Sequence, residues 1–242
     1  MTFDGEFQGR QVLVVGGTSG IGAAVGAAFA AAGAQVTVTG ATDAECETAR
    51  SALAGVTARR LDVRDPDAVA ACVAEQASLA VLVNCAGVIR RGAELDPAVF
   101  AEVLDINLNG TMRACAAARP LLAARGGCIV NTASMLSFFG GGLVPGYSAS
   151  KGGIVQLTKS LAIAYAADGI RVNAVAPGWI ATALTRPLQD DPARAEPILA
   201  RTPLRRWGTP EDVAGPVLFL ASAAARFVTG VVLPVDGGYL VS

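Results

Sequence analysis

Short apolar runs alternate with helix-like segments along almost the whole chain, and this alternation limits the possible folds more than any other feature. The runs at 11–16 and 79–87 are almost continuously apolar, which is typical of strands covered on both faces. Strands that alternate with helices form right-handed βαβ units and a parallel sheet. The expected strands span 11–16, 34–40, 56–63, 79–87, 127–134, 170–178 and 231–238. The pattern predicts an α/β fold, a doubly wound parallel sheet of the Rossmann type with about seven strands and helices on both faces.

No shift in composition and no linker divides the chain, so we expect residues 1–242 to form a single dinucleotide-binding catalytic domain. A hydrophobic content of 52% with 16% charged residues is enough to build a large core. The expected helices end near 32, span 42–53, begin near 65, and span 97–124, 147–167 and 210–222. Residues 181–206 are rich in Pro, Arg and Asp without a clear period, and long irregular segments are often functional. We expect a substrate lid there.

Charge and cysteine usage exclude several classes of protein. The chain carries 19 basic and 20 acidic residues, which leaves no electrostatic footprint for nucleic acid. The polar start, MTFDGEFQGR, does not resemble a signal peptide, and no apolar run is long enough to span a bilayer. Five scattered cysteines without a C-x-x-C pair indicate reduced thiols. We expect a cytoplasmic protein with no membrane partner, no nucleic-acid partner and no metal.

A glycine-rich turn joins the first expected strand to the first expected helix. Gly16, Gly20 and Gly22 have the spacing G-x-x-x-G-x-G. Such a turn allows the backbone to approach a pyrophosphate, and the helix that follows offers free N–H groups to it. The position that usually reads the adenosine ribose is Gly40, and neither an acid nor an arginine follows it directly. This favours NAD over NADP, although Arg59 or Arg60 from the next strand leaves NADP possible.

Proton transfer must use a group other than imidazole, because the chain contains no histidine. Tyr147 and Lys151 are four residues apart, so they share one face of a helix, and Ser134 lies thirteen residues upstream of Tyr147. A cation about 4 Å away at an effective dielectric of about 20 favours phenolate by up to roughly 4 kcal/mol, or about three pKa units. We therefore expect the ammonium of Lys151 to lower the pKa of Tyr147 towards working pH.

Taken together, these motifs resemble the short-chain dehydrogenase/reductase family over nearly the whole length of the chain. The glycine loop is similar to the family's T-G-x-x-x-G-x-G, with Val15 in place of Thr. Asn84-Cys85-Ala86-Gly87 is similar to N-N-A-G, with Cys85 in place of the second Asn. The resemblance implies four catalytic residues: Asn107, Ser134, Tyr147 and Lys151. It also implies cofactor contacts at Gly16, Ser19, Gly20, Ile21, Gly22, Asp62, Val63, Asn84, Ala86, Gly87, Tyr147, Lys151, Pro177, Gly178, Ile180 and Thr182.

The resemblance also implies a reaction. A hydride passes between the nicotinamide and a secondary alcohol or ketone, Tyr147 exchanges the hydroxyl proton, and Ser134 stabilises the reacting oxygen. Lys151 holds the nicotinamide ribose, and Asn107 orients Lys151 through a water molecule. Residues 87–91 and 203–208 resemble the sugar-acid branch of the family. A polyhydroxylated or sugar-acid small molecule is thus the expected substrate, and for a sugar acid we expect Arg90 or an arginine in 186–206 to hold the carboxylate.

Other functions remain open at this point. A dinucleotide-binding sensor or regulatory protein would keep the fold without turnover, but such proteins tend to lose Tyr147 or Lys151. An enoyl reductase or nucleotide-sugar epimerase would share the fold, yet the Tyr–Lys spacing and the short C-terminal region fit them poorly. Much of the family assembles through its long helices and C-terminal strand, so the resemblance also implies a homotetramer.

Overall fold

Seven parallel strands form one sheet in the order β3-β2-β1-β4-β5-β6-β7 in this computed structural model, which describes residue 3 and residues 5–242. The strands are β1 (Gln11–Val15), β2 (Gln35–Gly40), β3 (Val56–Arg60), β4 (Val81–Asn84), β5 (Cys128–Thr132), β6 (Arg171–Pro177) and β7 (Val232–Val235). Each expected strand is present, and most are shorter than the apolar run that predicted them. The doubly wound parallel sheet is confirmed.

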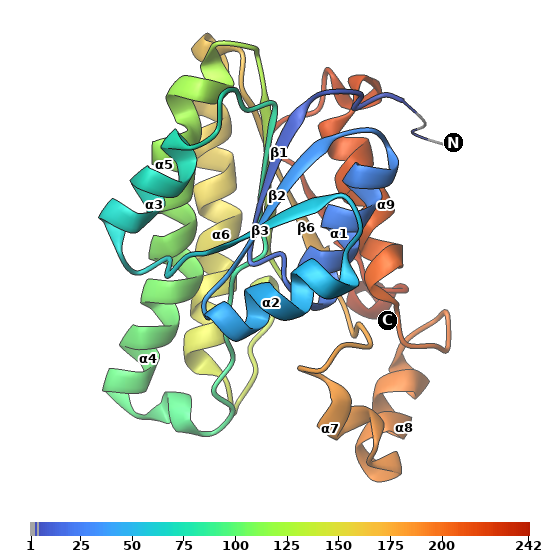
Figure 1. Cartoon of the computed structure of the whole chain (residues 1–242). Helices are drawn as coiled ribbons and strands as arrows, with labels where there is room; N and C mark the ends of the chain where they lie inside the picture. Colours follow the sequence, from blue (N-terminus) through green and yellow to red (C-terminus); the bar gives the residue numbers. More distant parts are fainter. Residues whose placement is uncertain (1–2, 4) are drawn as a thin grey trace.

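Helices cover both faces of the sheet (Figure 1). They are α1 (Gly20–Ala31), α2 (Asp43–Ala52), α3 (Pro66–Ala74), α4 (Pro97–Leu104), α5 (Gly110–Ala123), α6 (Pro145–Ala164), α7 (Arg186–Gln189), α8 (Pro192–Arg201) and α9 (Pro210–Ala221). Helices α1 and α9 lie on one face, and α3, α5 and α6 lie on the other (Figure 1). Among the described residues, no helix combines the length and apolarity that crossing a membrane requires.

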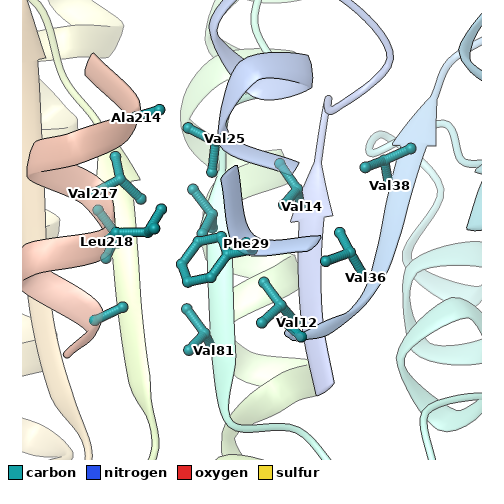
Figure 2. Close-up of a cluster of buried hydrophobic side chains, with 14 of the residues drawn as sticks. Val12, Val14, Val25, Phe29, Val36, Val38, Val81, Ala214, Val217 and Leu218 are labelled. Atoms are coloured by element: carbon teal, nitrogen blue, oxygen red, sulfur yellow. The ribbon is translucent and has the colours of Figure 1, made fainter. Parts of the chain in front are cut away.

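The larger part of the core lies between the sheet and the pair α1 and α9 (Figure 2). Valines of β1 and β2 project towards this layer because alternate residues of a strand face the same side. Phe29 of α1 is fully buried among them and meets Phe7 edge to face, with ring centroids 4.9 Å apart. Burying a side chain of this size contributes about 1.5–3 kcal/mol. This layer holds α1, and with it the glycine loop, against the sheet.

Local capping signals explain several helix boundaries. Helix α2 begins with a capping box in which Thr42 and Glu45 satisfy each other's backbone N–H groups. Helix α6 begins at Pro145, two residues before the expected start, because proline suits the first turn of a helix. The structure also contains α7 and α8 within 181–206, where no helix was predicted. Each has proline in its first turn.

The expected continuous helix at 97–124 is divided into three parts. Helix α4 ends at Leu104, a π-helical segment spans Asp105–Asn109, and α5 then continues to Ala123. Single π-helical turns of this kind often occur at functional sites, because they redirect side chains that a regular helix would place elsewhere. Asn107 lies in the middle of this turn and is fully buried.

The strand order reverses next to β1, which has β2 on one side and β4 on the other. In open α/β sheets, ligands bind outside the carboxyl ends of the strands at such a reversal. Under this edge, Asn84 of β4 donates to Asn131 of β5 at 2.9 Å, and Asn131 donates to Thr158 of α6 at 3.0 Å. These buried bonds fix α6 against the sheet and hold the side chains of its first turns above the edge.

Candidate active site

Tyr147 and Lys151 lie together on α6 beside the carboxyl end of β5. The Lys151 Nζ lies 5.5 Å from the centre of the Tyr147 ring and donates to the backbone carbonyl of Thr132 at 2.7 Å. Lys151 is 4% exposed, and Tyr147 is half-buried. The two groups therefore share one environment at the carboxyl edge of the sheet.

Burial changes the acidity of both groups. It lowers the pKa of Lys151 to about 8, an effect that Cys85 partly opposes. Burial also raises the pKa of Tyr147 above its usual value of 10.0, while a hydrogen bond from Ser134 lowers it and the negative charge of Glu94 raises it further. In the protein alone, Tyr147 is thus a neutral phenol at physiological pH.

This result corrects the expectation that the ammonium of Lys151 lowers the pKa of Tyr147 towards working pH: the pKa is raised instead. The Lys151 ammonium donates to the Thr132 carbonyl, and burial lowers the pKa of Lys151, so that its charged form is less favoured. The sequence could not reveal either effect, because one depends on a carbonyl of β5 and the other on burial. The two side chains lie together, and the phenol is held in its acid form.

These pKa directions predict opposite pH profiles for the two directions of reaction. Alcohol oxidation needs the phenolate, whose fraction grows as pH rises towards the raised pKa of Tyr147, so its rate should increase from about pH 6 to about pH 10. Ketone reduction needs the phenol, which stays protonated over this range, so its rate should decline only as Lys151 loses its charge through about pH 8. Initial rates in both directions at saturating cofactor test this, and an oxidation rate that is flat or falling above neutrality would contradict it.

Ser134 lies at the end of β5, where it caps a short 3-10 helix (Met135–Ser137). Its Oγ accepts from the Leu136 N–H at 3.2 Å, and the same hydroxyl lowers the pKa of the Tyr147 phenol. Ser137 completes the turn: its Oγ accepts from the Ser134 N–H at 3.2 Å and donates to the Lys151 carbonyl at 2.7 Å. The turn 134–137 is thereby tied to the helix that carries Tyr147 and Lys151.

Asn107 reaches the same edge from the π-helical turn. Its Oδ1 accepts from the Val88 N–H at 2.8 Å, and its Nδ2 donates to the Val88 carbonyl at 3.0 Å and to Ser150 Oγ at 3.1 Å. A side chain at Gly87 would meet Asn107 Oδ1 at 3.3 Å and Lys151 Nζ at 3.7 Å. The four residues expected to be catalytic are therefore brought together.

The glycine loop forms a cradle that larger residues would fill. A Cβ at Gly16, where φ is +77°, would overlap the Ala86 backbone, and a Cβ at Gly22 would overlap the Gly16 carbonyl. Ser19 is the N-cap of α1 without a side-chain cap bond, and the first turn of α1 contains no acid. The free N–H groups and the positive end of the helix suit a pyrophosphate. These residues fit a nicotinamide dinucleotide.

The segment after β6 lies over this loop. Thr182 Cγ2 would lie 3.4 Å from a Cβ at Gly20, although 162 positions separate the two residues in the sequence. Gly178 donates its N–H to the Val235 carbonyl at 3.0 Å and lies against Asp236, where a side chain would not fit. Pro177 ends β6 and pairs with Val235, while Ile180 bridges to Gly208 and is 4% exposed. The expected nicotinamide segment therefore faces the expected pyrophosphate loop.

Of the other expected cofactor residues, Asp62 is partly exposed, whereas Ile21, Val63 and Asn84 pack in or against the core. Asp62 lies beyond β3, half exposed, with its carboxylate held by the Arg64 guanidinium, which lowers the pKa of Asp62 to about 2. Ile21 packs on the core under the glycine loop, and Val63 is buried against Gly110. Asn84 is also buried: its side chain points to Asn131, so its part is to hold β4 and β5 together beneath the site.

A carboxylate lies at the end of β2, where the sequence showed none. Glu45 Oε2 accepts from the Ala41 N–H at 2.7 Å and from the Thr42 N–H at 3.3 Å. It would lie 3.0 Å from a Cβ at Gly40. The capping pattern of Thr42 and Glu45 was the available signal, because a capping box folds its acid back over the strand end. Arg60 pairs in register with Gly40 and forms an exposed ion pair with Asp43 at 3.5 Å.

Glu94 is the second residue that the sequence did not single out. It is 1% exposed, and its carboxylate accepts from the N–H of Tyr147 at 2.7 Å. No short motif marks it, because 53 positions separate the two residues. Among the described residues, no group of histidine, cysteine or acidic side chains is arranged to hold a metal ion.

Known proteins match the chain over nearly its whole length. A family model described as Enoyl-(Acyl carrier protein) reductase matches residues 15–240. The 2-dehydro-3-deoxy-D-gluconate 5-dehydrogenase of Bacillus subtilis (strain 168) is 42% identical, with 97% of this chain and 96% of that protein covered. Galactitol 2-dehydrogenase (L-tagatose-forming) of Cereibacter sphaeroides is 40% identical, with 98% and 97% covered.

A solved structure is also similar to this chain over its whole length. It is that of a proposed 2-deoxy-D-gluconate 3-dehydrogenase from Agrobacterium tumefaciens with bound NADP, which is 42% identical and superposes with a TM-score of 0.90 over 100% of this chain and 99% of that one. The full-length relatives are dehydrogenases of hydroxyl groups, and the expected glycine loop and Ser–Tyr–Lys pattern stand at one sheet edge. The chain belongs to the short-chain dehydrogenase/reductase family and is an NAD(P)-dependent oxidoreductase that acts on CH–OH groups.

Proposed function

We propose that this enzyme transfers a hydride between a nicotinamide cofactor and a secondary hydroxyl of a sugar acid, with Tyr147 as the general acid and base. The observation that carries the proposal is the placement of Tyr147 and Lys151 together at the carboxyl edge of the sheet, with a Ser134 hydroxyl that lowers the pKa of the phenol. The nicotinamide supplies hydride transfer when bound. Ser134 stabilises charge on the substrate oxygen, Lys151 holds the nicotinamide ribose, and Asn107 orients Lys151 through water.

The sugar-acid substrate is supported by the relative from Bacillus subtilis, whose name places it on a deoxygluconate. The galactitol dehydrogenase favours a neutral polyol as the second candidate. Two arginines are available to hold a carboxylate. Arg90 follows the loop after β4 and lies 3.7 Å from Glu102, with both side chains nearly half exposed, a weak pair that a substrate can replace. Arg201 stacks on Tyr239 at 4.2 Å and on Phe139 at 5.3 Å beside the turn 134–137.

The arginine in the expected R-W-G segment is a poorer anchor. Arg206 forms two bonds to the Asp212 carboxylate and lowers the pKa of Asp212 to about 2. A guanidinium engaged in this way with a carboxylate of its own chain has little capacity for a second one. Its contact holds the base of the segment 181–206 to the start of α9, and we propose that this segment, with α7 and α8, closes over the substrate as a lid of the single domain.

We expect the enzyme to prefer D-gluconate to D-glucitol, which differ at the carboxylate, by at least about tenfold in kcat/KM, because a bidentate arginine contact is lost with the neutral polyol. Cofactor reduction with NAD and with NADP measures both substrate and cofactor choice. Arg90→Gln and Arg201→Gln are compared with Arg50→Gln, which removes an exposed arginine paired with Glu47 on α2. Equal kcat/KM for the two substrates would contradict the sugar-acid assignment. An unchanged preference for D-gluconate in both variants would contradict the role of Arg90 and Arg201 in holding its carboxylate.

We propose NAD as the preferred cofactor, with contacts along the glycine loop, at Asp62 and Val63, and at residues 177–182. The Glu45 carboxylate beside Gly40 places negative charge where a 2′-phosphate would lie, which supports NAD. Arg60 and the NADP bound to the relative from Agrobacterium tumefaciens support NADP. Tighter binding of NADP than of NAD would overturn this choice without affecting the reaction.

We also propose a cytoplasmic homotetramer. The described cysteines are all free and mostly buried, as is typical of a reducing compartment. Apolar side chains are exposed on α5, α6 and the C-terminal region, where the family's contacts would lie. They include Met112, Ile163, Phe227 and Val241. Covering them in an assembly would remove an apolar surface that isolated subunits rarely show.

A further inference from the structure

A buried carboxylate lies between the loop that follows β4 and the first turn of α6, and the reaction as described does not use it. Glu94 Oε1 accepts from the Arg90 N–H at 2.7 Å, and its Oε2 accepts from the Tyr147 N–H at 2.7 Å. No cation among the described residues forms an ion pair with Glu94. The two N–H groups and the positive end of α6 are what stabilise its charge.

The same loop is joined to the same helical turn a second time. Asn107 is bonded to both backbone groups of Val88 and donates to Ser150 Oγ, and Ser150 Oγ donates to the Tyr147 carbonyl at 2.7 Å. Glu94 therefore holds the Tyr147 N–H, while Asn107 and Ser150 hold its carbonyl. Both polar backbone groups of Tyr147 are thus tied to residues 88–94.

Space for the carboxylate depends on a glycine. A Cβ at Gly146, directly before Tyr147, would meet Glu94 Oε2 at 3.3 Å and Phe100 at 3.3 Å. Any larger residue would crowd the carboxylate or move it away from α6. The close approach of Glu94 to the helix is consequently built into the packing of α4 against α6.

We propose that Glu94 is a positioning residue that holds the substrate-facing segment 88–94 in register with Tyr147, so that a bound hydroxyl meets the phenol. The inference rests on the proposed proton-transfer role of Tyr147. Its chemical basis is that a carboxylate has two acceptor oxygens, one for each N–H, whereas glutamine has only one. Glu94→Gln keeps the size of the side chain and can retain only one of the two bonds.

The variant Glu94→Gln should lower kcat by roughly tenfold or more at saturating cofactor, since small displacements of reacting groups can cost up to about a hundredfold. Cofactor affinity should remain within about twofold, because the glycine loop does not contact Glu94. The matched control is Glu6→Gln. In the unmodified enzyme, the Glu6 carboxylate accepts from the N–H of Ala223, which is distant in sequence, at 2.8 Å. The kcat of Glu6→Gln should be unchanged.

A pH profile separates positioning from general loss of stability. Removing the negative charge of Glu94 lowers the pKa of Tyr147, so the alkaline rise of alcohol oxidation should move to lower pH in Glu94→Gln. The Ser134 hydroxyl and the Lys151 ammonium also face the phenol and are unchanged in this variant. A lower kcat with an unmoved profile would indicate only a structural role and would overturn the proposal.

Two further measurements keep the outcome decisive. If Glu94→Gln does not fold, Glu94→Asp retains the charge but is one methylene shorter, so it cannot span both N–H groups, and a folded Glu94→Asp with the kcat of the unmodified enzyme would overturn the proposal. Measuring each variant on both an acid and a neutral polyol separates the hypotheses. Failure of the sugar-acid assignment changes which substrate is used, whereas failure of this inference leaves either kcat or the pH profile unaltered on every substrate.

Discussion

Replacing Tyr147 with phenylalanine should reduce turnover by at least about a hundredfold, equal to about 2.7 kcal/mol of transition-state stabilisation, and leave cofactor binding nearly unchanged. The substitution removes one hydroxyl from a half-buried ring whose backbone is held by Glu94 and Ser150, so the fold should persist. No histidine is available to replace the lost proton donor. Single-turnover rates with bound cofactor, together with cofactor titration by fluorescence, measure the two effects separately.

Tyr165→Phe is the matched control for this prediction. Tyr165 ends the same helix and is 4% exposed, and its ring lies against the Arg119 guanidinium at 4.6 Å, at the opposite end of α6 from the crevice. Loss of the Tyr165 hydroxyl should leave kcat within about twofold of the unmodified enzyme, because this group has no part in proton transfer. Normal turnover in Tyr147→Phe would reject the proton-donor role of this residue.

Replacing Gly22 with alanine should weaken cofactor binding by at least about tenfold, or about 1.4 kcal/mol. The added methyl group would overlap the Gly16 carbonyl and would lie 2.9 Å from the Gly17 Cα. Neither atom belongs to a flexible side chain, so the loop itself must move away from the position that presents its N–H groups to pyrophosphate. Calorimetric titration with NADH and NADPH measures the loss.

Gly215→Ala tests whether this effect is specific to the loop. Gly215 lies within α9, and nothing lies within 4 Å of its added Cβ. Alanine there should raise stability by about 0.5–1 kcal/mol through its better helix propensity, with no change in cofactor affinity. Cofactor binding in Gly22→Ala equal to that of the unmodified enzyme would contradict the pyrophosphate assignment of the loop.

The sequence predicted the architecture and the meeting of the candidate catalytic residues at one sheet edge, because both depend on short-range patterns. The alternation of strand-like and helix-like segments identified all seven strands, and the apolar runs were clearest at β1 and β4, which are covered on both faces. The spacing of Tyr147 and Lys151 implied one helix face, and the strand ends implied one crevice, so their meeting followed from elementary geometry. These inferences did not require knowledge of any long-range contact.

The predictions that failed or were missing depended on contacts between distant residues. The raised pKa of Tyr147 depends on burial and on Glu94, which no spacing rule connects to it. The carboxylate at Gly40 comes from the next helix, folded back by its capping box. Helices α7 and α8 were missed because proline and mixed charges conceal their apolar faces. Propensity does not reveal such features when tertiary packing determines them.

The π-helical segment Asp105–Asn109 limits changes in chain length among relatives of this enzyme. Such a turn accommodates one residue more than a regular helix does, and that extra residue sets the direction in which Asn107 points. Deleting one residue between Pro97 and Leu104 would rotate the amide by about 100°, away from Val88 and Ser150. We therefore expect an insertion or deletion in this stretch to reduce activity more than an exchange of one of its exposed side chains.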